Sequence, residues 1–149
     1  MKAAVCYYSY HHGNTLKVLQ AMAEGTDLEL IDVAHCDHAD LAPYDVVGFA
    51  SGIYGFSFHE KVVTFLKENL PQGKPVFFVY TYGGAKGSGS KAIAKEALKK
   101  NSTLLGEFSC RGYNTFGPFQ WFGGSGKGLP SQTDLKKAKT FYQNLIAAK

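Results

Sequence analysis

Short, strongly apolar segments alternate with amphipathic segments along the whole chain. Five segments are too apolar to leave one face in water, so they predict buried strands at residues 2–9, 28–33, 44–51, 75–81 and 103–110. Between and after them, apolar residues recur three and four positions apart, which predicts amphipathic helices at residues 15–24, 59–70, 91–100 and 135–146. The last helix follows Ser131 and Asp134, which are spaced as in a capping box, with aspartate in place of the usual glutamate.

Buried strands that alternate with helices predict a parallel sheet with helices on both of its faces. The expected fold class is therefore α/β, a three-layer sandwich around a five-stranded parallel sheet. Between the second and third strands only residues 34–43 remain, which leaves room for little more than a turn of helix. No repeat and no linker interrupts the chain, so we expect residues 1–149 to form a single domain.

The composition excludes several classes of protein. With 149 residues, 45% of them hydrophobic and 14% aromatic, the chain can build a sizeable core, which excludes intrinsic disorder. No apolar run approaches the ~18–20 residues of a membrane helix, and the first residues do not build the apolar region of a secretion signal. The 3 cysteines lack paired spacing, which argues against a disulfide framework. We therefore expect a cytoplasmic protein that does not insert into a membrane.

Charge is distributed unevenly along the chain. Residues 1–70 hold 4 Lys and 9 Asp or Glu, a net charge of −5, whereas residues 71–149 hold 12 Lys or Arg and 3 Asp or Glu, a net charge of +9. Such asymmetry can indicate an anionic partner. The alternative, which we favour, is that the lysines of residues 91–100 and 136–139 form ordinary solvent faces of helices. Because no nucleic-acid-binding motif accompanies the charge, we expect no nucleic acid partner.

Candidate chemistry lies in the loops that follow the strands, because ligands of open parallel sheets bind beyond the carboxyl ends of the strands. The loop at residues 9–15 follows the first strand and opens a helix. Its small hydroxyl and amide side chains, its glycine and the positive end of the helix dipole suit a phosphate group, with His11 and His12 as helpers. The alternative is an ordinary turn in which Asn14 or Thr15 caps the helix.

Two further loops combine small, aromatic and glycine residues. The loop at residues 51–59 would expose Ile53, Tyr54 and Phe56 unless a flat apolar ligand or a partner covers them. The alternative is that these side chains fold back over the core. The loop at residues 81–84 has the same character at the next strand. Three such loops at neighbouring strand ends describe a slot for a planar, phosphorylated ligand.

The stretch YYSYHHGNTLKV resembles the phosphate loop of the flavodoxin family, Ser/Thr-x-Thr-Gly-Asn-Thr after the first strand. The resemblance covers nearly the whole chain. It implies the strand order 2-1-3-4-5 and one non-covalently bound flavin mononucleotide (FMN). The residues that it implies for the phosphate are Ser9, His11, His12, Gly13, Asn14 and Thr15. Those that it implies for the two sides of the flavin ring are Ser51, Gly52, Ile53, Tyr54 and Gly55 on one side, and Thr81, Tyr82, Gly83 and Gly84 on the other.

The chain departs from the family pattern at three points. The first loop is one residue longer, with His12 at the usual threonine, and the second loop has no tryptophan, so Tyr54 or Phe56 would be the stacking ring. The carboxylates that commonly surround the flavin are missing, and the loops instead hold three cations, Lys86, Arg111 and Lys127. Because a cation stabilises negative charge added to the ring, we expect a less negative reduction potential than in an acidic flavodoxin.

Weaker motifs have ordinary explanations. Residues 87–92 match Gly-x-Gly-x-x-Ala but lie well past the fourth strand, where the dinucleotide fingerprint has no mechanical meaning. The His, Cys and Asp side chains of residues 35–40 fit no usual zinc spacing. Cys110 stands next to Arg111, which would lower the pKa of its thiol, but a packed thiol is the favoured interpretation. No catalytic residue and no metal ligand is predicted.

Two functions are consistent with these features. The favoured one is an electron carrier, a monomer that docks transiently on redox partner proteins and supports no substrate chemistry of its own. The alternative is a small FMN-dependent oxidoreductase that acts on a quinone- or protoporphyrinogen-type substrate. In such an enzyme the aromatic and glycine-rich residues 111–130 would cover the bound substrate. Those residues would otherwise pack over the sheet edge or form a docking flap.

Overall fold

The computed structural model describes residues 1–10, 13–54, 57–84, 86–112 and 128–148. These residues form one six-stranded sheet in which five strands run parallel in the order β2-β1-β3-β5-β6. The parallel strands are β1 (Ala3–Tyr8), β2 (Glu29–Asp32), β3 (Val46–Tyr54), β5 (Val76–Tyr82) and β6 (Leu104–Arg111). Counted without the short strand β4 (Ser57–Phe58), this order is the predicted 2-1-3-4-5, so the predicted fold class is confirmed.

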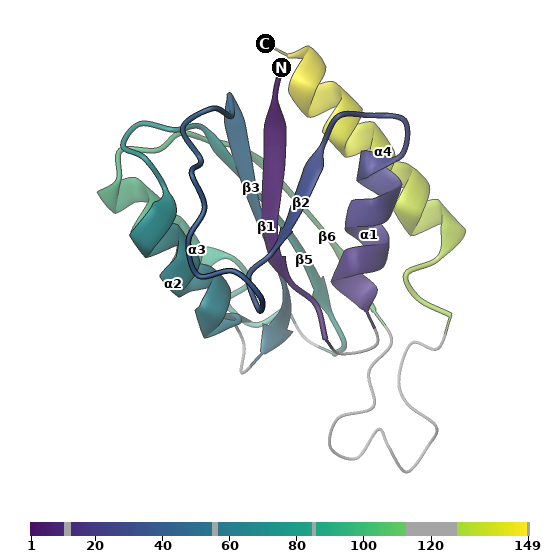
Figure 1. Cartoon of the computed structure of the whole chain (residues 1–149). Coiled ribbons are helices and arrows are strands. Elements are labelled where there is room, and N and C mark those ends of the chain that lie inside the picture. Colours follow the sequence, from purple (N-terminus) through teal and green to yellow (C-terminus); the bar gives the residue numbers. More distant parts are fainter. Residues whose placement is uncertain (11–12, 55–56, 85, 113–127, 149) are drawn as a thin grey trace.

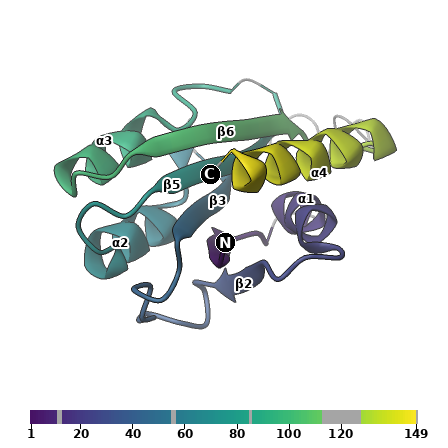
Figure 2. The same cartoon turned by 90° about the horizontal axis from the view of Figure 1, so that it is seen from above.

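Helices cover both faces of the sheet, as Figures 1 and 2 show. Within the described residues the helices are α1 (Asn14–Ala23), α2 (Glu60–Asn69), α3 (Lys91–Lys99) and α4 (Gln132–Ala147). The pair α1 and α4 packs together on one face, and α2 and α3 pack on the other. The predicted capping box at the start of α4 is present, with Ser131 and Asp134 each accepting the other's backbone N–H. The segment between β2 and β3 forms turns without a helix.

Alternate side chains of the central strands point into two apolar cores, one on each face of the sheet. In β5, Phe78 and Tyr80 belong to the core under α2 and α3, whereas Phe77 and Val79 belong to the core under α1 and α4. The ring of Phe77 lies against Gly48 of β3 so closely that a Cβ there would be 2.5 Å from it. Because both faces of the central strands are covered, these strands read as continuous apolar runs in the sequence.

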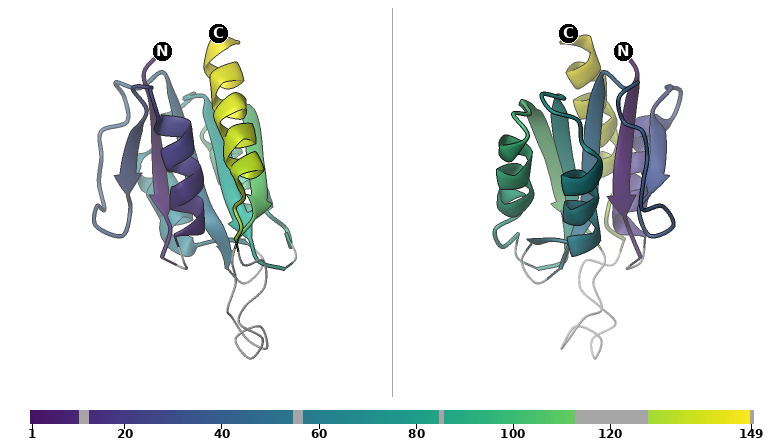
Figure 3. Two further views of the ribbon diagram at one scale, coloured as in Figure 1. Left: turned by 90° about the vertical axis from the view of Figure 1, so that its right-hand side faces the viewer. Right: turned by 60° about the vertical axis from the view of Figure 1, so that its left-hand side comes forward.

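The carboxyl ends of the parallel strands meet at one edge of the sheet, the lower edge in Figure 1. Strand β2 lies on one side of β1, and β3 and the strands after it lie on the other side. The direction in which successive strands are added to the sheet therefore reverses at β1. The two views of Figure 3 show the loops after β1, β3 and β5 at this same edge. A reversal of strand order at the carboxyl ends is where open α/β sheets bind ligands.

No helix in the part of the chain that the structure describes is long and apolar enough to span a membrane.

Candidate cofactor site

The loop after β1 enters helix α1 through Gly13, which adopts the left-handed conformation at φ 63° and ψ 24°. No side chain caps the helix in the usual way, because neither Asn14 nor Thr15 acts as a cap. Instead, the Oγ of Ser9 accepts the backbone N–H of Leu16 at 2.9 Å from across the loop. The first turn of α1 contains no acidic residue, so no carboxylate of that turn neutralises the positive end of the helix.

Side chains of the first turn of α1 reach the ends of two other strands. The Oγ1 of Thr15 lies 2.9 Å from the Oγ1 of Thr81 at the end of β5, and the hydrogen bond between them is buried. The side chain of Asn14 is buried against Gly112, where a Cβ would overlap with it. The first turn of α1 is therefore held directly against the carboxyl ends of β5 and β6.

The second predicted loop is a hairpin, which corrects the expectation of an open loop over residues 51–59. Strand β3 continues to Tyr54, and Ile53 and Tyr54 pair with Phe58 and Ser57 of β4. The Oγ of Ser51 is fully buried and accepts the backbone N–H of His59 at 3.0 Å. The Ser51 side chain therefore closes the base of the hairpin from inside, whereas Ile53 and Tyr54 are half-buried.

An aromatic cluster supports this hairpin. The imidazole of His59 stacks on the ring of Tyr8 with centroids 3.9 Å apart and planes at 14°. The ring of Tyr54 stands edge-on to both, 5.1 Å from His59 and 6.0 Å from Tyr8. The Nδ1 of His59 accepts the N–H of Lys61 at 3.1 Å and so caps α2. Burial lowers the pKa of His59, which favours the neutral ring that this cap requires.

Neither Tyr8 nor His59 was among the predicted site residues. The signal available for Tyr8 was its position at the end of the first strand, and that for His59 was its position directly before a helix. Neither position indicates that the two rings meet, because 50 intervening residues separate them in the chain and only the pairing of β1 with β3 brings them together.

Tyr10 is anchored to the end of β2. Its hydroxyl donates a hydrogen bond to Oδ2 of Asp32, and this bond raises the pKa of Tyr10 to about 12. The other carboxylate oxygen of Asp32 accepts the N–H of Ala34 at 2.9 Å. The chain that enters the first loop is thus held toward β2, on the side of the site away from β5.

The third loop follows β5 and is tied to β6. The N–H of Gly112 donates to the carbonyl of Tyr82 at 2.9 Å, and Nη2 of Arg111 donates to the carbonyl of Gly83 at 3.1 Å. The Nζ of Lys86 lies 5.7 Å from the centroid of the Tyr82 ring. Gly84 is exposed, with open space where a Cβ would stand. The chain can therefore be approached closely at Gly84.

The site residues predicted from the sequence are brought together at one edge of the sheet where the structure describes them. His11, His12, Gly55 and Phe56 lie outside the described residues, as do residues 113–127 of the long segment. Thr15, Ser51 and Thr81 are buried and hold the loops to one another or close them. Other predicted site residues are more accessible to solvent, among them Gly13, Ile53, Tyr54, Tyr82, Gly83 and Gly84.

The cysteines of the chain lie in ordinary structural surroundings. Burial is the main reason why the pKa of the Cys110 thiol is raised to about 12. The predicted lowering of this pKa by Arg111 is therefore not found, and the thiol stays protonated at neutral pH. Cys36 donates a hydrogen bond from Sγ to the carbonyl of His38 at 2.9 Å. Among the described residues, no three His, Cys, Asp or Glu side chains are placed to hold a metal ion.

The fold and this arrangement of loops define a flavodoxin-like protein, and comparisons with known proteins agree. A family model described as a flavodoxin domain matches residues 5–116, so the chain belongs to the flavodoxin family. An uncharacterized protein of Methanocaldococcus jannaschii is 34% identical over 148 residues, which cover 98% of this chain and 99% of that protein.

Solved structures share the fold at low sequence identity. A flavodoxin from the domain Archaea superposes with a TM-score of 0.70 at 16% identity, covering 98% of this chain and 97% of that one. A flavodoxin of Streptococcus pneumoniae superposes with a TM-score of 0.69 at 14% identity over 99% of both chains. Rubredoxin oxygen:oxidoreductase of Desulfovibrio gigas superposes with a TM-score of 0.73 at 18% identity. The superposition covers 99% of this chain and 35% of that longer chain.

Proposed function

We propose that the chain binds FMN at the carboxyl edge of its sheet and transfers electrons between redox partner proteins, without a substrate reaction of its own. The observation that carries the proposal is the assembly of three ligand-type loops at one edge. The Thr15–Thr81 hydrogen bond joins the first loop to the third. The Tyr8–His59 stack holds the second against the end of β1. Family membership supports FMN as the flavin.

The residues of the first loop fit a phosphate group. Gly13 has no atom within 4 Å of the position of a Cβ, so a phosphate can approach its backbone closely. The hydroxyls of Ser9 and Thr15 and the amide of Asn14 are neutral donors, and the amino end of α1 adds the positive end of a helix dipole. Ser9, Gly13, Asn14 and Thr15 would hold the phosphate, with neutral donors in place of a charged side chain.

The hairpin and the third loop fit the two sides of a flat ring. Tyr54 offers an aromatic face from the hairpin, and its orientation is fixed by Tyr8 and His59. Tyr82 and the glycines after it offer a second surface whose backbone can come close to a ligand. When bound, FMN supplies one- and two-electron transfer. The chain's own contribution is to orient the ring and exclude water from its faces.

Charge at the third loop sets the direction in which the protein shifts the reduction potential. The described residues of 52–58 and 81–89 contain no carboxylate, and Lys86 stands beside Tyr82. A unit charge ~8 Å from the ring at an effective dielectric constant near 20 stabilises negative charge on it by about 2 kcal/mol, before screening. We therefore expect a less negative potential than in a flavodoxin with an acidic site.

Photoreduction of the FMN-loaded protein tests the electron-carrier role. We expect the reduced protein to pass its electrons once to cytochrome c, in a fixed ratio to bound FMN. We also expect no sustained turnover with NADH or NADPH and a quinone, because a carrier passes on only the electrons that its FMN holds. Turnover that continues for many cycles and scales with protein concentration would contradict the carrier and favour the oxidoreductase.

A further inference from the structure

The two sides of the proposed flavin slot carry charges of opposite sign. On the side of the hairpin and β2, the exposed or half-buried charged groups include three carboxylates, Asp32, Asp37 and Glu60, and one ammonium group, that of Lys61. On the side of the third loop lie four exposed cations, which we call the basic rim: Lys86, Lys91, Lys95 and Arg111. The charge asymmetry along the sequence thus becomes an asymmetry across the site.

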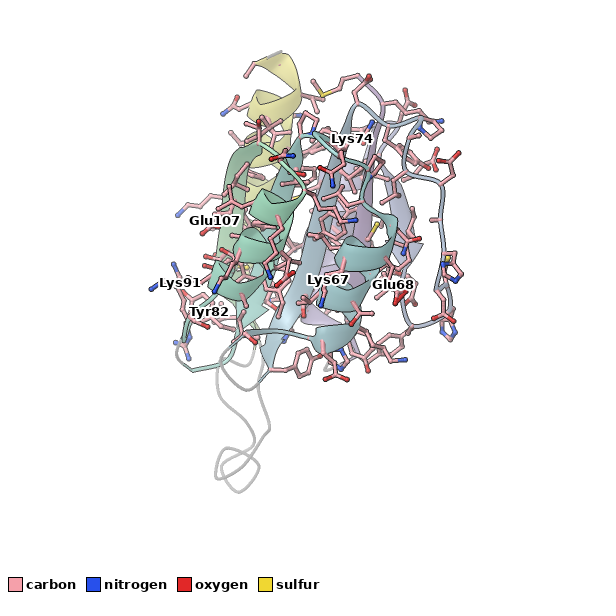
Figure 4. The ribbon with its side chains drawn as sticks, turned by 90° about the vertical axis from the view of Figure 1, so that its left-hand side faces the viewer. Lys67, Glu68, Lys74, Tyr82, Lys91 and Glu107 are labelled. Carbon is pink, nitrogen blue, oxygen red and sulfur yellow. The ribbon has the colours of Figure 1, made fainter. Side chains whose placement is uncertain are left out.

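The basic rim is fixed in place next to the third loop. Arg111 is bonded to Gly83, and Lys86 lies over the ring of Tyr82. Lys91 begins α3, and its backbone N–H donates to the carbonyl of Ser88 at 3.1 Å. Figure 4 shows Tyr82 and Lys91 at the same end of the molecule, where the strands finish.

The three lysines of the basic rim form no ion pair within the described residues. Among the described residues, no carboxylate lies within 4.0 Å of the ammonium groups of Lys86, Lys91 or Lys95. By contrast, Lys99, one turn after Lys95, pairs with Glu96 at 3.2 Å. Lys91 and Lys95 are four residues apart on α3, a spacing at which like charges repel.

One carboxylate lies at the amino end of α3. The first turn of this helix has no acidic residue, and its N-cap residue Ser90 makes no capping hydrogen bond. The hydroxyl of Ser90 instead donates to Glu107 at 2.6 Å. Figure 4 shows Glu107 further along the face than Lys91, away from the strand ends. Glu107 therefore offsets part of the positive end of α3, and the positive charge of the basic rim rests on its four side chains.

We propose that the basic rim is the docking surface for a redox partner whose own cofactor is surrounded by acidic side chains. The proposal rests on the FMN-binding function and names the partner's surface chemistry. A rim of one sign beside the slot steers an oppositely charged protein so that the two cofactors approach at the third loop. The acidic side of the slot disfavours a reversed orientation.

Stopped-flow kinetics with two probe proteins test the proposal: a reduced acidic [2Fe–2S] ferredoxin as donor and the basic cytochrome c as acceptor. The test variant is Lys91→Glu with Lys95→Glu. The matched control is Lys67→Glu with Lys99→Glu, in the last turns of α2 and α3. It changes the net charge by the same amount, but at the ends of these helices that lie away from the third loop.

We expect the rate constant with ferredoxin to fall about tenfold from about 20 mM to about 500 mM NaCl. At low salt the test variant should lower it about tenfold and the control by less than about twofold. With cytochrome c the test variant should react faster than the natural protein. A ferredoxin rate that rises with salt, or equal effects of the two variants, would overturn the proposal.

Amide NMR spectra of the labelled protein as isolated give a readout that does not need flavin. Unlabelled ferredoxin at low salt should shift or broaden the signals of residues 86–95. Unchanged signals there would overturn the proposal. It would also be overturned if single-stranded DNA shifted these signals at physiological salt and ferredoxin did not shift them under the same conditions. Failure of FMN to bind in a separate titration would contradict the proposed function instead, so the two failures are distinguishable.

Discussion

The hydroxyl of Thr15 in the first turn of α1 lies 2.9 Å from the hydroxyl of Thr81 at the end of β5, with both residues almost fully buried. This contact joins the start of a helix to the end of a strand, 66 residues apart in the chain. It fixes the distance between the proposed phosphate site and the proposed ring site without any ligand. The shape of the proposed slot thus depends on core packing as well as on loop composition.

Replacing either threonine with valine should destabilise the protein. Thr15→Val or Thr81→Val keeps the shape but leaves the other hydroxyl buried without its partner, which costs about 1–3 kcal/mol. The double variant should cost clearly less than the sum, because no orphaned hydroxyl remains. Urea denaturation measures all four free energies of unfolding. If the loss in the double variant equals the sum of the two single losses to within about 0.5 kcal/mol, the two hydroxyls are not coupled.

Gly13 and Gly25 form a matched pair for testing the phosphate loop. Both have positive φ, 63° and 73°, and open space at the Cβ position, but Gly25 follows the other end of α1. Substitution with alanine should lower the free energy of unfolding of each by about 1–2 kcal/mol. Only Gly13→Ala places a methyl group where the phosphate would approach, so only it should weaken FMN binding, by at least about tenfold. Equal affinities of the two variants would argue against a phosphate at Gly13.

His59 should make stability depend on pH. Burial lowers its pKa below the ordinary value of 6.5, and of the smaller effects that of Glu60 raises the pKa and that of Lys61 lowers it. The unfolded chain then binds a proton more readily than the folded one, so this contribution is complete above pH 6.5 and is lost as pH falls toward the folded pKa. His59→Asn keeps a capping side chain without the titration. Denaturation curves from about pH 7 to about pH 5 should show the natural protein losing stability relative to this variant. Parallel pH profiles would contradict the assignment.

The three cysteines should differ sharply in reactivity. Cys6 and Cys110 are buried, and burial raises the pKa of both thiols, to about 12 for Cys110. Cys36 is partly exposed. Because the thiolate is the reactive form, a disulfide reagent should modify one thiol in the folded protein and all three after denaturation. Rapid modification of Cys110 in the folded state would show that its environment is not apolar.

The main elements of the fold could be predicted because each carries its own periodicity. Helices α2 and α3 and the strands under them start and end within a few residues of the predicted limits, and the capping box marks α4. The hairpin at Tyr54 was missed because its pairing depends on Ser51 closing the base from inside, which leaves no pattern in the local sequence.

The site was predictable in composition but not in its internal contacts. Glycine, hydroxyl and aromatic residues after three strands indicated where a ligand would lie. The roles of individual side chains depend on contacts between distant segments, as with Tyr8 and His59 or Asn14 and Gly112. Such contacts follow from strand order and register, which periodicity alone does not specify.

Equilibrium titration with FMN and with riboflavin, followed by flavin fluorescence, tests the central claim most directly. The two ligands share the ring and differ in the phosphate. The account predicts FMN binding with a dissociation constant of about 1 μM or below, and riboflavin binding at least about tenfold weaker, because riboflavin lacks the group that Gly13 and the start of α1 would hold. No change in fluorescence at an FMN concentration of about 100 μM, or equal affinity for the two ligands, would contradict it.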